Sequence, residues 1–334
     1  MGTDQEIAVI GDGAMGSVCA IILANNGYPV RLWGAFPQNI EDMIESRENR
    51  KFLPGFKLPQ LLRPISQAEE ALDSASLVIS AVPCQYMRSV WQKLTPHLQD
   101  NAAIISVTKG IENETLLRPS EILAQITGSD RKLGAMSGPT IAGELAGQLP
   151  ATAVVASPDS QLAQCGQKIF TRKFFRLYTN ADLLGVELAG ASKNVIALAA
   201  GIIDGLGLGD NAKAALLTRG LVEITRLGLA LGAEEETFAG LAGLGDLVTT
   251  CISPLGRNRS VGEQIGKGQK LSDVLSSMDA VAEGVATTQS LTALARKHHV
   301  DMPITFKVHA VLFQGQDPQE AIAELMSRTP KSER

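Results

Sequence analysis

The sequence predicts an α/β N-terminal domain with a doubly wound sheet over residues 1–181 and an all-α C-terminal domain over residues 182–334. Two observations support this division. Before Asp182, short apolar runs alternate with helical segments, and after it the pattern changes to long segments of helical period. The chain also exceeds the roughly 250–300 residues at which a single core stops growing, so two domains are expected.

The first strand, turn and helix begin close to the N-terminus. An apolar run at residues 7–10 predicts a strand, the sequence Gly-Asp-Gly-Ala-Met-Gly follows at 11–16, and an apolar segment at 18–24 predicts a helix. The dipeptide Asn-Gly at 26–27 ends this helix, and residues 30–33 predict a second strand. These segments form a βαβ unit of about 30 residues.

The glycines of this turn predict a dinucleotide-binding site of the Rossmann type. Gly11 permits the tight turn, Gly13 lets backbone approach a pyrophosphate, and Gly16 lets the helix pack closely on the strand. The helix N-terminus adds unpaired N–H groups that attract an anion. An ordinary glycine-rich turn between strand and helix is the alternative.

Later apolar runs predict further strands, and three of them stop at proline or polar residues. These three are residues 77–82 before Pro83, 102–107 before Thr108-Lys109-Gly110, and 133–136 before Ser137-Gly138-Pro139-Thr140. Residues 153–156 and 174–178 are additional candidates. Because ligands of such sheets bind beyond the carboxyl ends of the strands, the three polar stops are expected to face one crevice.

Lys193 and Asn194 lie inside a 21-residue stretch, 183–203, whose only other charged residue is Glu187. A lysine among Ala, Val, Ile and Leu reaches water, finds a polar partner, or lies in a cleft that lowers its pKa. The last case suits proton transfer, and a surface lysine on an amphipathic helix is the alternative. The predicted domain boundary places Lys193 near an interdomain cleft.

Composition excludes several classes of function. The formal charge of −5 and pI near 5.5 provide no basic field for nucleic acid or an anionic membrane. The cysteines and histidines lack metal-binding spacing, so we expect no metal site and reduced thiols, as in a cytoplasmic protein. Residues 1–6 do not resemble a signal peptide. Glu187 and Lys193 argue against a membrane span over 183–203, because each costs roughly 2–3.5 kcal/mol near the bilayer centre.

Four polar segments each have a functional and a structural interpretation. Arg257 and Arg259 lie at a predicted helix start, where positive charge is unfavourable because of the helix dipole. Binding of a phosphate would explain them, and the alternative is that both are solvated surface residues. Asp246 after Gly-Leu-Gly either orients an ammonium or hydroxyl group, or caps a helix. The segment 137–140 resembles a helix start with proline in its first turn. Glu283 precedes another helix as a possible dipole partner.

Together these segments resemble the NAD(P)-dependent glycerol-3-phosphate dehydrogenase family of the bacterial type, from about Ile7 to about Phe313. The matching stretches are residues 11–16, 106–112, 137–142, 187–220 with Lys193-Asn194, 243–250, 257–259 and 281–284. The block at 187–220 is the most specific of them. The resemblance implies interconversion of dihydroxyacetone phosphate and sn-glycerol 3-phosphate, and supply of glycerol phosphate for phospholipid synthesis. It also implies a homodimer.

The resemblance assigns roles to individual residues of this sequence. Lys193 is implied as the general acid/base at the C2 oxygen. Substrate contacts are implied at Lys109, Gly138, Thr140, Lys193, Asp246, Gly256, Arg257 and Asn258. Cofactor contacts are implied at Gly11, Gly13, Ala14, Met15, Gly16, Tyr86, Lys109, Ala142, Arg257, Val281 and Glu283.

The segment after the second strand bears on the choice between NAD and NADP. NAD-binding proteins usually carry an acid at the end of that strand, and NADP-binding proteins an arginine near it. Here the sequence is Trp-Gly-Ala-Phe-Pro at 33–37, with Ala35 where related bacterial sequences often have a basic residue. NAD or NADP is expected, with a slight preference for NAD. Arg31 reaching a 2′-phosphate and Phe36 stacking on adenine are further possibilities.

Two further positions depart from the family pattern. Asp12 adds an acid inside the phosphate-binding turn, and its side chain is expected to point to solvent. Gly256 stands where related sequences often have serine, so one hydroxyl group for the substrate phosphate is missing and only the backbone N–H remains. Substrate affinity is expected to be somewhat weaker.

Two alternative functions come from different classes. The first is another two-domain reductase of the hydroxyacid or ketopantoate type, which needs a carboxylate-binding site without Lys109, Arg257 and Asn258 gathered together. The second is a non-catalytic dinucleotide-sensing module, which needs only the glycine turn. The whole polar set is present, so the dehydrogenase is the preferred interpretation.

Overall fold

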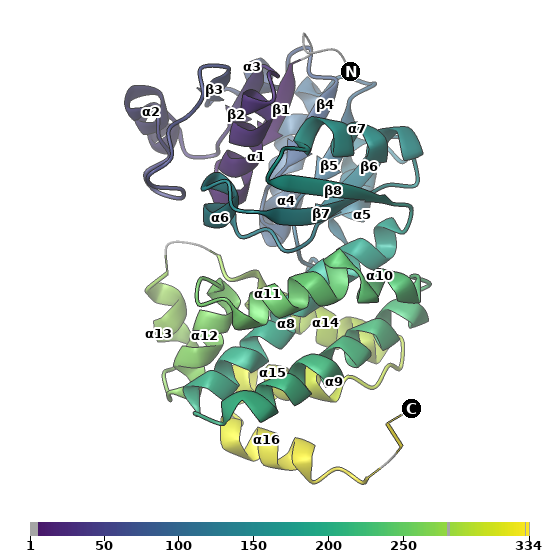
Figure 1. Ribbon diagram of the computed structural model, residues 1–334. Coiled ribbons are helices and arrows are strands. Elements are labelled where there is room, and N and C mark those ends of the chain that lie inside the picture. The colour runs from purple at the N-terminus through teal and green to yellow at the C-terminus, as the bar shows by residue number, and fades with distance from the viewer. Residues whose placement is uncertain (1–5, 279–280, 331, 334) are drawn as a thin grey trace.

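The computed structural model describes residues 6–278, 281–330 and 332–333. A sheet flanked by helices forms the N-terminal half, and helices alone form the C-terminal half (Figure 1). The predicted fold class, an N-terminal Rossmann-like α/β domain followed by a helical domain, is confirmed. The last strand ends at Asn180 and the first helix of the C-terminal half begins at Leu183.

The sheet has eight strands in the order β3-β2-β1-β4-β5-β6-β7-β8. In chain order they are β1 (Ile7–Ile10), β2 (Val30–Trp33), β3 (Leu62–Ile65), β4 (Leu77–Ser80), β5 (Ala103–Ser106), β6 (Leu133–Ser137), β7 (Ala151–Ala156) and β8 (Phe175–Asn180). All neighbours pair in parallel except β6 and β7, which are antiparallel. The first six strands therefore have their carboxyl ends at one edge, which faces the helical half (Figure 1).

Two features of the sheet differ from the sequence prediction. Strand β3 was not predicted, because Arg63 and Pro64 interrupt its apolar pattern; proline is accepted there since β3 is an edge strand. The reversal at β7 was also not predicted, because a short apolar run carries no information about strand direction.

Helices cover both faces of the sheet (Figure 1). They are α1 (Ala14–Asn25), α2 (Pro37–Ser46), α3 (Ala68–Leu72), α4 (Cys84–Leu94), the 3₁₀ turn η1 (Thr95–His97), α5 (Pro119–Thr127), α6 (Ala142–Ala146) and α7 (Ser160–Phe170). The close contact of α1 with the sheet depends on glycine: a Cβ at Gly16 would lie 1.8 Å from the carbonyl oxygen of Gly11. Gly11 itself has φ +112° and lies against the backbone of Ala81. The predicted roles of these two glycines in turn and packing fit this geometry.

The helical half is arranged around one long central helix, α8 (Leu183–Gly205). The other elements are α9 (Gly209–Ala230), α10 (Glu235–Ala239), the π-helical turn η2 (Leu241–Gly245), α11 (Asp246–Ile252), α12 (Arg257–Gly266), α13 (Leu271–Ser276), α14 (Glu283–Lys297), α15 (Pro303–Phe313) and α16 (Pro318–Met326). By length and composition α8 passes as a membrane span, but 94% of its most apolar window is buried inside the protein. It is therefore a core helix.

Helices α8 and α12 approach closely because glycines line their contact. A Cβ at Gly201 would lie 1.9 Å from the carbonyl oxygen of Arg259, and one at Gly262 would lie 2.0 Å from that of Leu198. Backbone therefore packs on backbone along this crossing. The N-terminus of α12, where Arg257 begins the helix, is held beside the middle of α8.

The second charged residue of the apolar stretch, Glu187, joins the two halves. Its carboxylate is 1% exposed and accepts hydrogen bonds from the backbone N–H (2.8 Å) and hydroxyl (2.6 Å) of Ser120. Arg118 forms an ion pair with this carboxylate, with its Nη1 atom 2.5 Å from Oε2 of Glu187. Since Arg118 and Ser120 belong to the start of α5, Glu187 links α8 to the sheet domain.

Candidate active site

Lys193 lies in the middle of α8 and is 6% exposed, so it is not a surface lysine. Its Nζ atom lies 2.5 Å from Oδ1 of Asp246 and also hydrogen-bonds the hydroxyl of Thr250. Both partners come from α11, one helical turn apart. The sequence alternative of a solvated amine on an amphipathic helix is thereby excluded.

Asp246 also pairs with Lys109, which comes from the segment after β5 in the sheet domain. Lys109 Nζ lies 2.6 Å from Oδ2 of Asp246 and donates to the carbonyl oxygen of Gly138 at 3.1 Å. One carboxylate therefore holds two ammonium groups, one from each half of the protein. The interdomain position expected for Lys193 fits this geometry.

Burial and charge adjust the protonation of this cluster. Burial lowers the pKa of Lys193 to about 8; Asp246 opposes the shift and the positive charge of Lys109 adds to it. Burial alone would raise the pKa of Asp246, but Lys109 and Lys193 outweigh it and hold that pKa below its usual range. Lys193 therefore gives up a proton near neutral pH while Asp246 stays ionised.

The structure decides between the two interpretations of Asp246. It is the first residue of α11, the N-cap position belongs to Gly245, and its carboxylate points to the two lysines. The capping alternative is wrong, because the π-helical turn η2 leads directly into α11. Thr250 was missed by the sequence analysis, although its spacing of four residues from Asp246 placed it on the same helix face.

The segment after β6 contributes backbone to the same region. Gly138 has φ +142°, a conformation that other residues rarely adopt, and its carbonyl oxygen accepts from Lys109 and from the hydroxyl of Thr140 at 3.1 Å. A Cβ at Gly190 of α8 would lie 3.5 Å from the side chain of Lys109, so α8 packs under this lysine. The predicted helix start is wrong here: α6 begins at Ala142, and the preceding residues form a loop.

The starts of α12 and α14 meet beside Lys193-Asn194. Asn258 is buried, and its Oδ1 accepts from the backbone N–H of Gly284 at 3.0 Å. A Cβ at Gly284 would lie 2.8 Å from the carbonyl oxygen of Asn194, which places Asn258 close to α8. Gly256 is the N-cap of α12, and no side chain caps that end. The N–H groups in the first turn of α12 therefore remain available to an anion. The N–H of Gly256 itself, expected to bind the phosphate, instead donates to the carbonyl oxygen of Ser253 at 3.1 Å.

The two arginines of α12 have different surroundings. Arg259 pairs with Asp204 at 2.6 Å and with Glu263 at 3.1 Å, so it stabilises the packing of α12 on α8. Arg257 is exposed and donates to the carbonyl oxygen of Val281 at 2.8 Å. Of this pair, Arg257 is the one placed to bind a ligand.

The glycine turn fits a dinucleotide. Gly13 is the N-cap of α1 with no side-chain cap, and the space beside its Cα is open to 4 Å. Backbone N–H groups at the start of α1, around Ala14, are thus free to bind a pyrophosphate. Met15 and Ala142 pack against the same core cluster, which brings the start of α6 beside α1.

Glu283 reaches from α14 to the sheet domain. Its Oε1 accepts from the backbone N–H of Cys84 at 3.0 Å, and its Oε2 is buried without a partner among the described residues. Burial raises the pKa of Glu283 to about 7, against the opposing effects of that N–H group and of Arg257. An unpaired buried carboxyl oxygen fits a polar ligand group at this position. Tyr86, near the start of α4, is 56% exposed.

Two expectations near the adenosine end of the turn are wrong. Asp12 does not point to solvent: it is 6% exposed, and Asn39 donates to its Oδ2 at 2.6 Å. Arg31 is directed away, since it pairs with Glu6 and donates to the carbonyl oxygens of Glu70 (2.6 Å) and Asp73 (2.8 Å). The Arg31 side chain is therefore held by structural contacts and is not directed to a 2′-phosphate.

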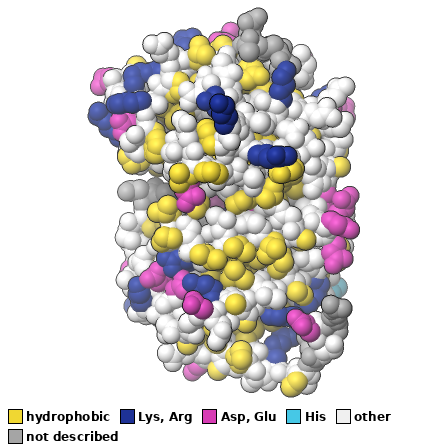
Figure 2. Space-filling model, in the orientation of Figure 1, with side chains coloured by type: hydrophobic (Ala, Val, Ile, Leu, Met, Phe, Trp, Pro, Cys, Tyr) yellow, Lys and Arg dark blue, Asp and Glu magenta, His cyan; other side chains and the backbone are white. Residues whose placement is uncertain are grey.

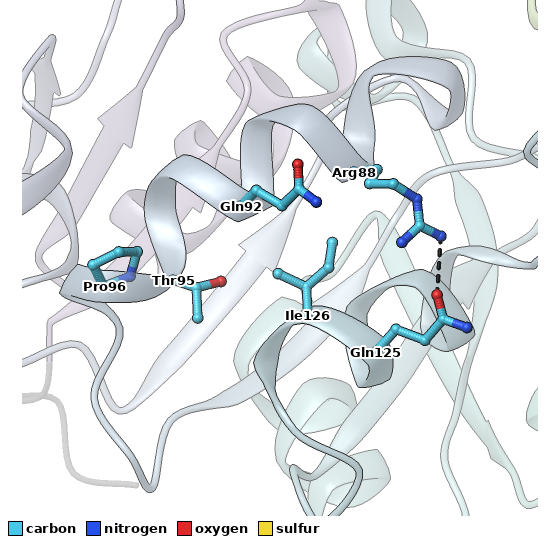
Figure 3. Close-up of a pocket in the computed structure, with 6 residues that line it drawn as sticks. All are labelled: Arg88, Gln92, Thr95, Pro96, Gln125 and Ile126. Atoms are coloured by element: carbon cyan, nitrogen blue, oxygen red, sulfur yellow. Dashed lines mark hydrogen bonds between the residues drawn. The ribbon is translucent and has the colours of Figure 1, made fainter.

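Other features lie apart from this site. A surface hollow between α4 and α5 is lined by Arg88, Gln92, Thr95, Pro96, Gln125 and Ile126 (Figure 3). Arg88 there donates to Gln125 at 3.1 Å and pairs with Glu112, so its charge is compensated. None of the predicted site residues lines the hollow. Within the described part of the chain, no three His, Cys, Asp or Glu side chains form a cluster able to hold a metal ion.

Comparison with known proteins identifies the family. The N-terminal model of NAD-dependent glycerol-3-phosphate dehydrogenase matches residues 6–163, and the C-terminal model matches residues 182–323. The chain is 46% identical over 331 residues to glycerol-3-phosphate dehydrogenase [NAD(P)+] of Syntrophotalea carbinolica, covering 98% of this chain and 99% of the relative. Identity to the enzyme of the same name from Citrifermentans bemidjiense is 48%, with the same coverage.

A solved structure agrees with these matches. The crystal structure of glycerol-3-phosphate dehydrogenase from Coxiella burnetii superposes with a TM-score of 0.95 at 36% identity, covering 98% of this chain and all of that one. These matches favour the dehydrogenase over the hydroxyacid or ketopantoate-type reductase and over a non-catalytic module. The chain belongs to the NAD-dependent glycerol-3-phosphate dehydrogenase family, and it is an oxidoreductase that interconverts dihydroxyacetone phosphate and sn-glycerol 3-phosphate with NAD or NADP.

Proposed function

We propose that Lys193 is the general acid/base of this reaction. The observation that supports this most directly is the position of its amine: buried, near-neutral in pKa, and held by Asp246 and Thr250 at the contact between the two halves. A nicotinamide dinucleotide, when bound, supplies or accepts the hydride at C2 of the substrate. In the reducing direction Lys193 donates a proton to the C2 oxygen, and in the oxidising direction its neutral amine removes that proton.

The neighbouring residues have complementary roles in this proposal. Asp246 keeps both ammonium groups in place, and Lys109 and Thr140 contact the substrate beside Gly138. The free backbone N–H groups in the first turn of α12, together with Arg257 and Asn258, bind the substrate phosphate beside Gly256. Because Gly256 provides no hydroxyl group, this phosphate site depends on backbone N–H groups and on Arg257.

The proposed cofactor residues divide between two regions. Gly11, Gly13, Ala14, Met15, Gly16 and Ala142 belong to the pyrophosphate region at the start of α1. The remaining residues belong to the region where the two halves meet: Tyr86 and Lys109 come from the sheet domain, and Arg257, Val281 and Glu283 come from the helical half. The unpaired Oε2 of Glu283 supports a polar contact there.

Replacement of Lys193 tests the proposal. Lys193→Ala is expected to lower kcat by roughly 10²–10⁴-fold, the usual contribution of a general acid/base, while NADH affinity measured by fluorescence titration is retained. Lys213→Ala is a suitable control, since it removes a lysine that pairs with Asp204. If Lys193→Ala turns over at a near-normal rate, Lys193 has no part in proton transfer.

We further propose a homodimer in the cytoplasm that supplies glycerol phosphate for phospholipid synthesis. Hydrophobic side chains gather in a band across the helical half on the face shown in Figure 2. Helix α9 presents Val222 (38% exposed) and Leu229 (47%) at its surface, which is consistent with a partner there. Sedimentation equilibrium should give twice the monomer mass of 35.3 kDa. A monomer at micromolar concentration would contradict the dimer without affecting the proposed chemistry.

A further inference from the structure

Asp12 places a carboxylate at the carboxyl end of β2. Gly11 donates from its backbone N–H to the carbonyl oxygen of Trp33 at 2.9 Å, so the glycine turn runs beside the last residue of β2. A Cβ built on Gly34 would lie only 2.5 Å from Cγ of Asp12 and 2.6 Å from its Oδ2. The absence of a side chain at Gly34 therefore makes room for this carboxylate.

The position of Asp12 is fixed by surrounding amides and hydroxyls. Asn39 of α2, itself buried, donates to Oδ2 at 2.6 Å. Asn49 and Ser17 donate to the backbone carbonyl oxygen of Asp12 at 2.6 and 3.2 Å. The backbone N–H of Asp12 itself also acts on the carboxylate, but within the described ranges no other residue donates to Oδ1, and this atom is not among the buried ones without a partner. One carboxylate oxygen is thus held, and the other is available to a ligand.

The end of β2 is where Rossmann proteins select between the two dinucleotides. An acid there binds the adenosine ribose hydroxyls of NAD, and a cation there accepts the 2′-phosphate of NADP. Residues 33–37 of this chain carry neither. We propose that Asp12, projecting from the glycine turn instead of from β2, binds the adenosine ribose hydroxyls through Oδ1 and selects NAD over NADP. The proposal rests on dinucleotide binding at the glycine turn and is independent of the role of Lys193.

The negative charge of Asp12 itself favours this selection. A 2′-phosphate brings about two negative charges close to the carboxylate, which repels it. Arg31 is turned away by its own partners. Lys51 is the cation that acts on Asp12, and its ammonium lies over the rings of Phe36 (5.5 Å) and Phe52 (5.0 Å). Burial raises the pKa of Asp12, while the hydrogen bonds from Asn39 and from the backbone N–H of Asp12 itself, and the charge of Lys51, oppose that shift.

Binding measurements without substrate test the proposal. Dissociation constants for NADH and NADPH are measured by fluorescence titration of the wild type and of Asp12→Asn, Asp12→Ala and Glu45→Gln. The wild type is expected to bind NADH at least about tenfold more tightly, and this preference should fall about tenfold or more in both Asp12 variants, the size expected when a hydrogen bond to a charged group is lost. Glu45→Gln removes an equal charge from an exposed position on α2 and should keep the wild-type preference.

A second pair of ligands isolates the hydroxyl contact. ADP and 2′-deoxy-ADP, competed against NADH, form a double-mutant cycle with Asp12→Ala. The wild type should bind 2′-deoxy-ADP several-fold more weakly than ADP, and the variant should bind both equally. Neither ligand carries the C2 oxygen on which Lys193 is proposed to act, so loss of the proposed proton-transfer role would not change this result.

Four outcomes would overturn the proposal. They are equal affinity of the wild type for NADH and NADPH, an unchanged preference with unchanged affinities in a folded Asp12→Asn variant, an unchanged preference with equal losses of affinity for both cofactors in that variant, or no discrimination between ADP and 2′-deoxy-ADP by the wild type. Equal losses would mean that Asp12 only fixes α2 against the glycine turn. The wild-type comparisons need no variant, so they can overturn the proposal even if both Asp12 variants fail to fold, which circular dichroism would show.

Discussion

Two lysines share the single carboxylate of Asp246, and this sharing explains why Lys193 can exchange a proton near neutral pH. An isolated buried lysine would lose its charge, and a lysine with its own carboxylate would hold its proton tightly. Lys193 lies between these cases, because Lys109 takes one oxygen of Asp246 at 2.6 Å and adds a positive charge nearby. The near-neutral pKa of the Lys193 amine therefore depends on both Asp246 and Lys109.

A pH profile follows from the lowered pKa of Lys193. In the proposed mechanism, reduction of dihydroxyacetone phosphate needs the protonated amine, so its kcat/KM should fall as pH rises through about 8. Oxidation of glycerol 3-phosphate needs the neutral amine, so its kcat/KM should rise through the same pH and then level off. Initial rates in both directions between about pH 7 and 10 provide the measurement. Profiles that are flat in both directions would show that another group transfers the proton.

Sequence patterns predicted seven of the eight strands and the change to helices after Asp182, and they failed where an element depends on its neighbours. The first βαβ unit and the start of α12 at Arg257 follow directly from local sequence. Strand β3 could not be predicted, because its stability comes from pairing with β2 at the sheet edge. The loop before α6 resembled a helix start, but the φ of Gly138 is incompatible with one.

The candidate site shows the same limit. Lys193 was suspected because a charge in an apolar helix needs a reason, and Asp246 was suspected with its role undecided. That both lysines converge on Asp246 depends on two segments 137 and 53 residues away from it in the chain, which no local pattern reveals. The burial of the Asp12 side chain was not predicted, because the space for it depends on Gly34, which follows β2 and not β1.

The glycine-lined crossing of α8 and α12 predicts a large effect from one methyl group. Gly201→Ala should lower the free energy of unfolding by about 1–3 kcal/mol or more, because the new Cβ would overlap the carbonyl oxygen of Arg259. Gly143→Ala in α6 is the matched control: its site is open, so stability should change by no more than about 1 kcal/mol, in the stabilising direction. Urea denaturation measures both. Equal stability of the two variants would contradict the tight crossing.

At the scale of the whole molecule, the buried ion pair of Glu187 and Arg118 connects the two halves, whose boundary at residue 182 stays a prediction. Arg118→Ala leaves the Glu187 carboxylate, 1% exposed, without its counter-charge. The free energy of unfolding should fall by about 3–5 kcal/mol, the usual effect of breaking a buried pair. Arg63→Ala, which breaks the exposed pair with Glu70, should cost less than about 1 kcal/mol. Similar losses in the two variants in thermal or urea unfolding would show that the buried pair is not a strong link.

Glu187 and Lys193 occupy one continuous helix, and this fixes the rotation about the helix axis between the domain contact at Glu187 and the amine proposed to transfer the proton. Each residue added to an α-helix turns everything beyond it by about 100°. After insertion of a single residue between these two positions, only one of the two contacts could form. Either Glu187 would bind Ser120 and Lys193 would be turned away from Asp246, or Lys193 would bind Asp246 and Glu187 would be turned away from Ser120. Length variation among enzymes built this way should therefore be confined to their loops, and any chimera that exchanges the two halves should be joined without a change of length in α8.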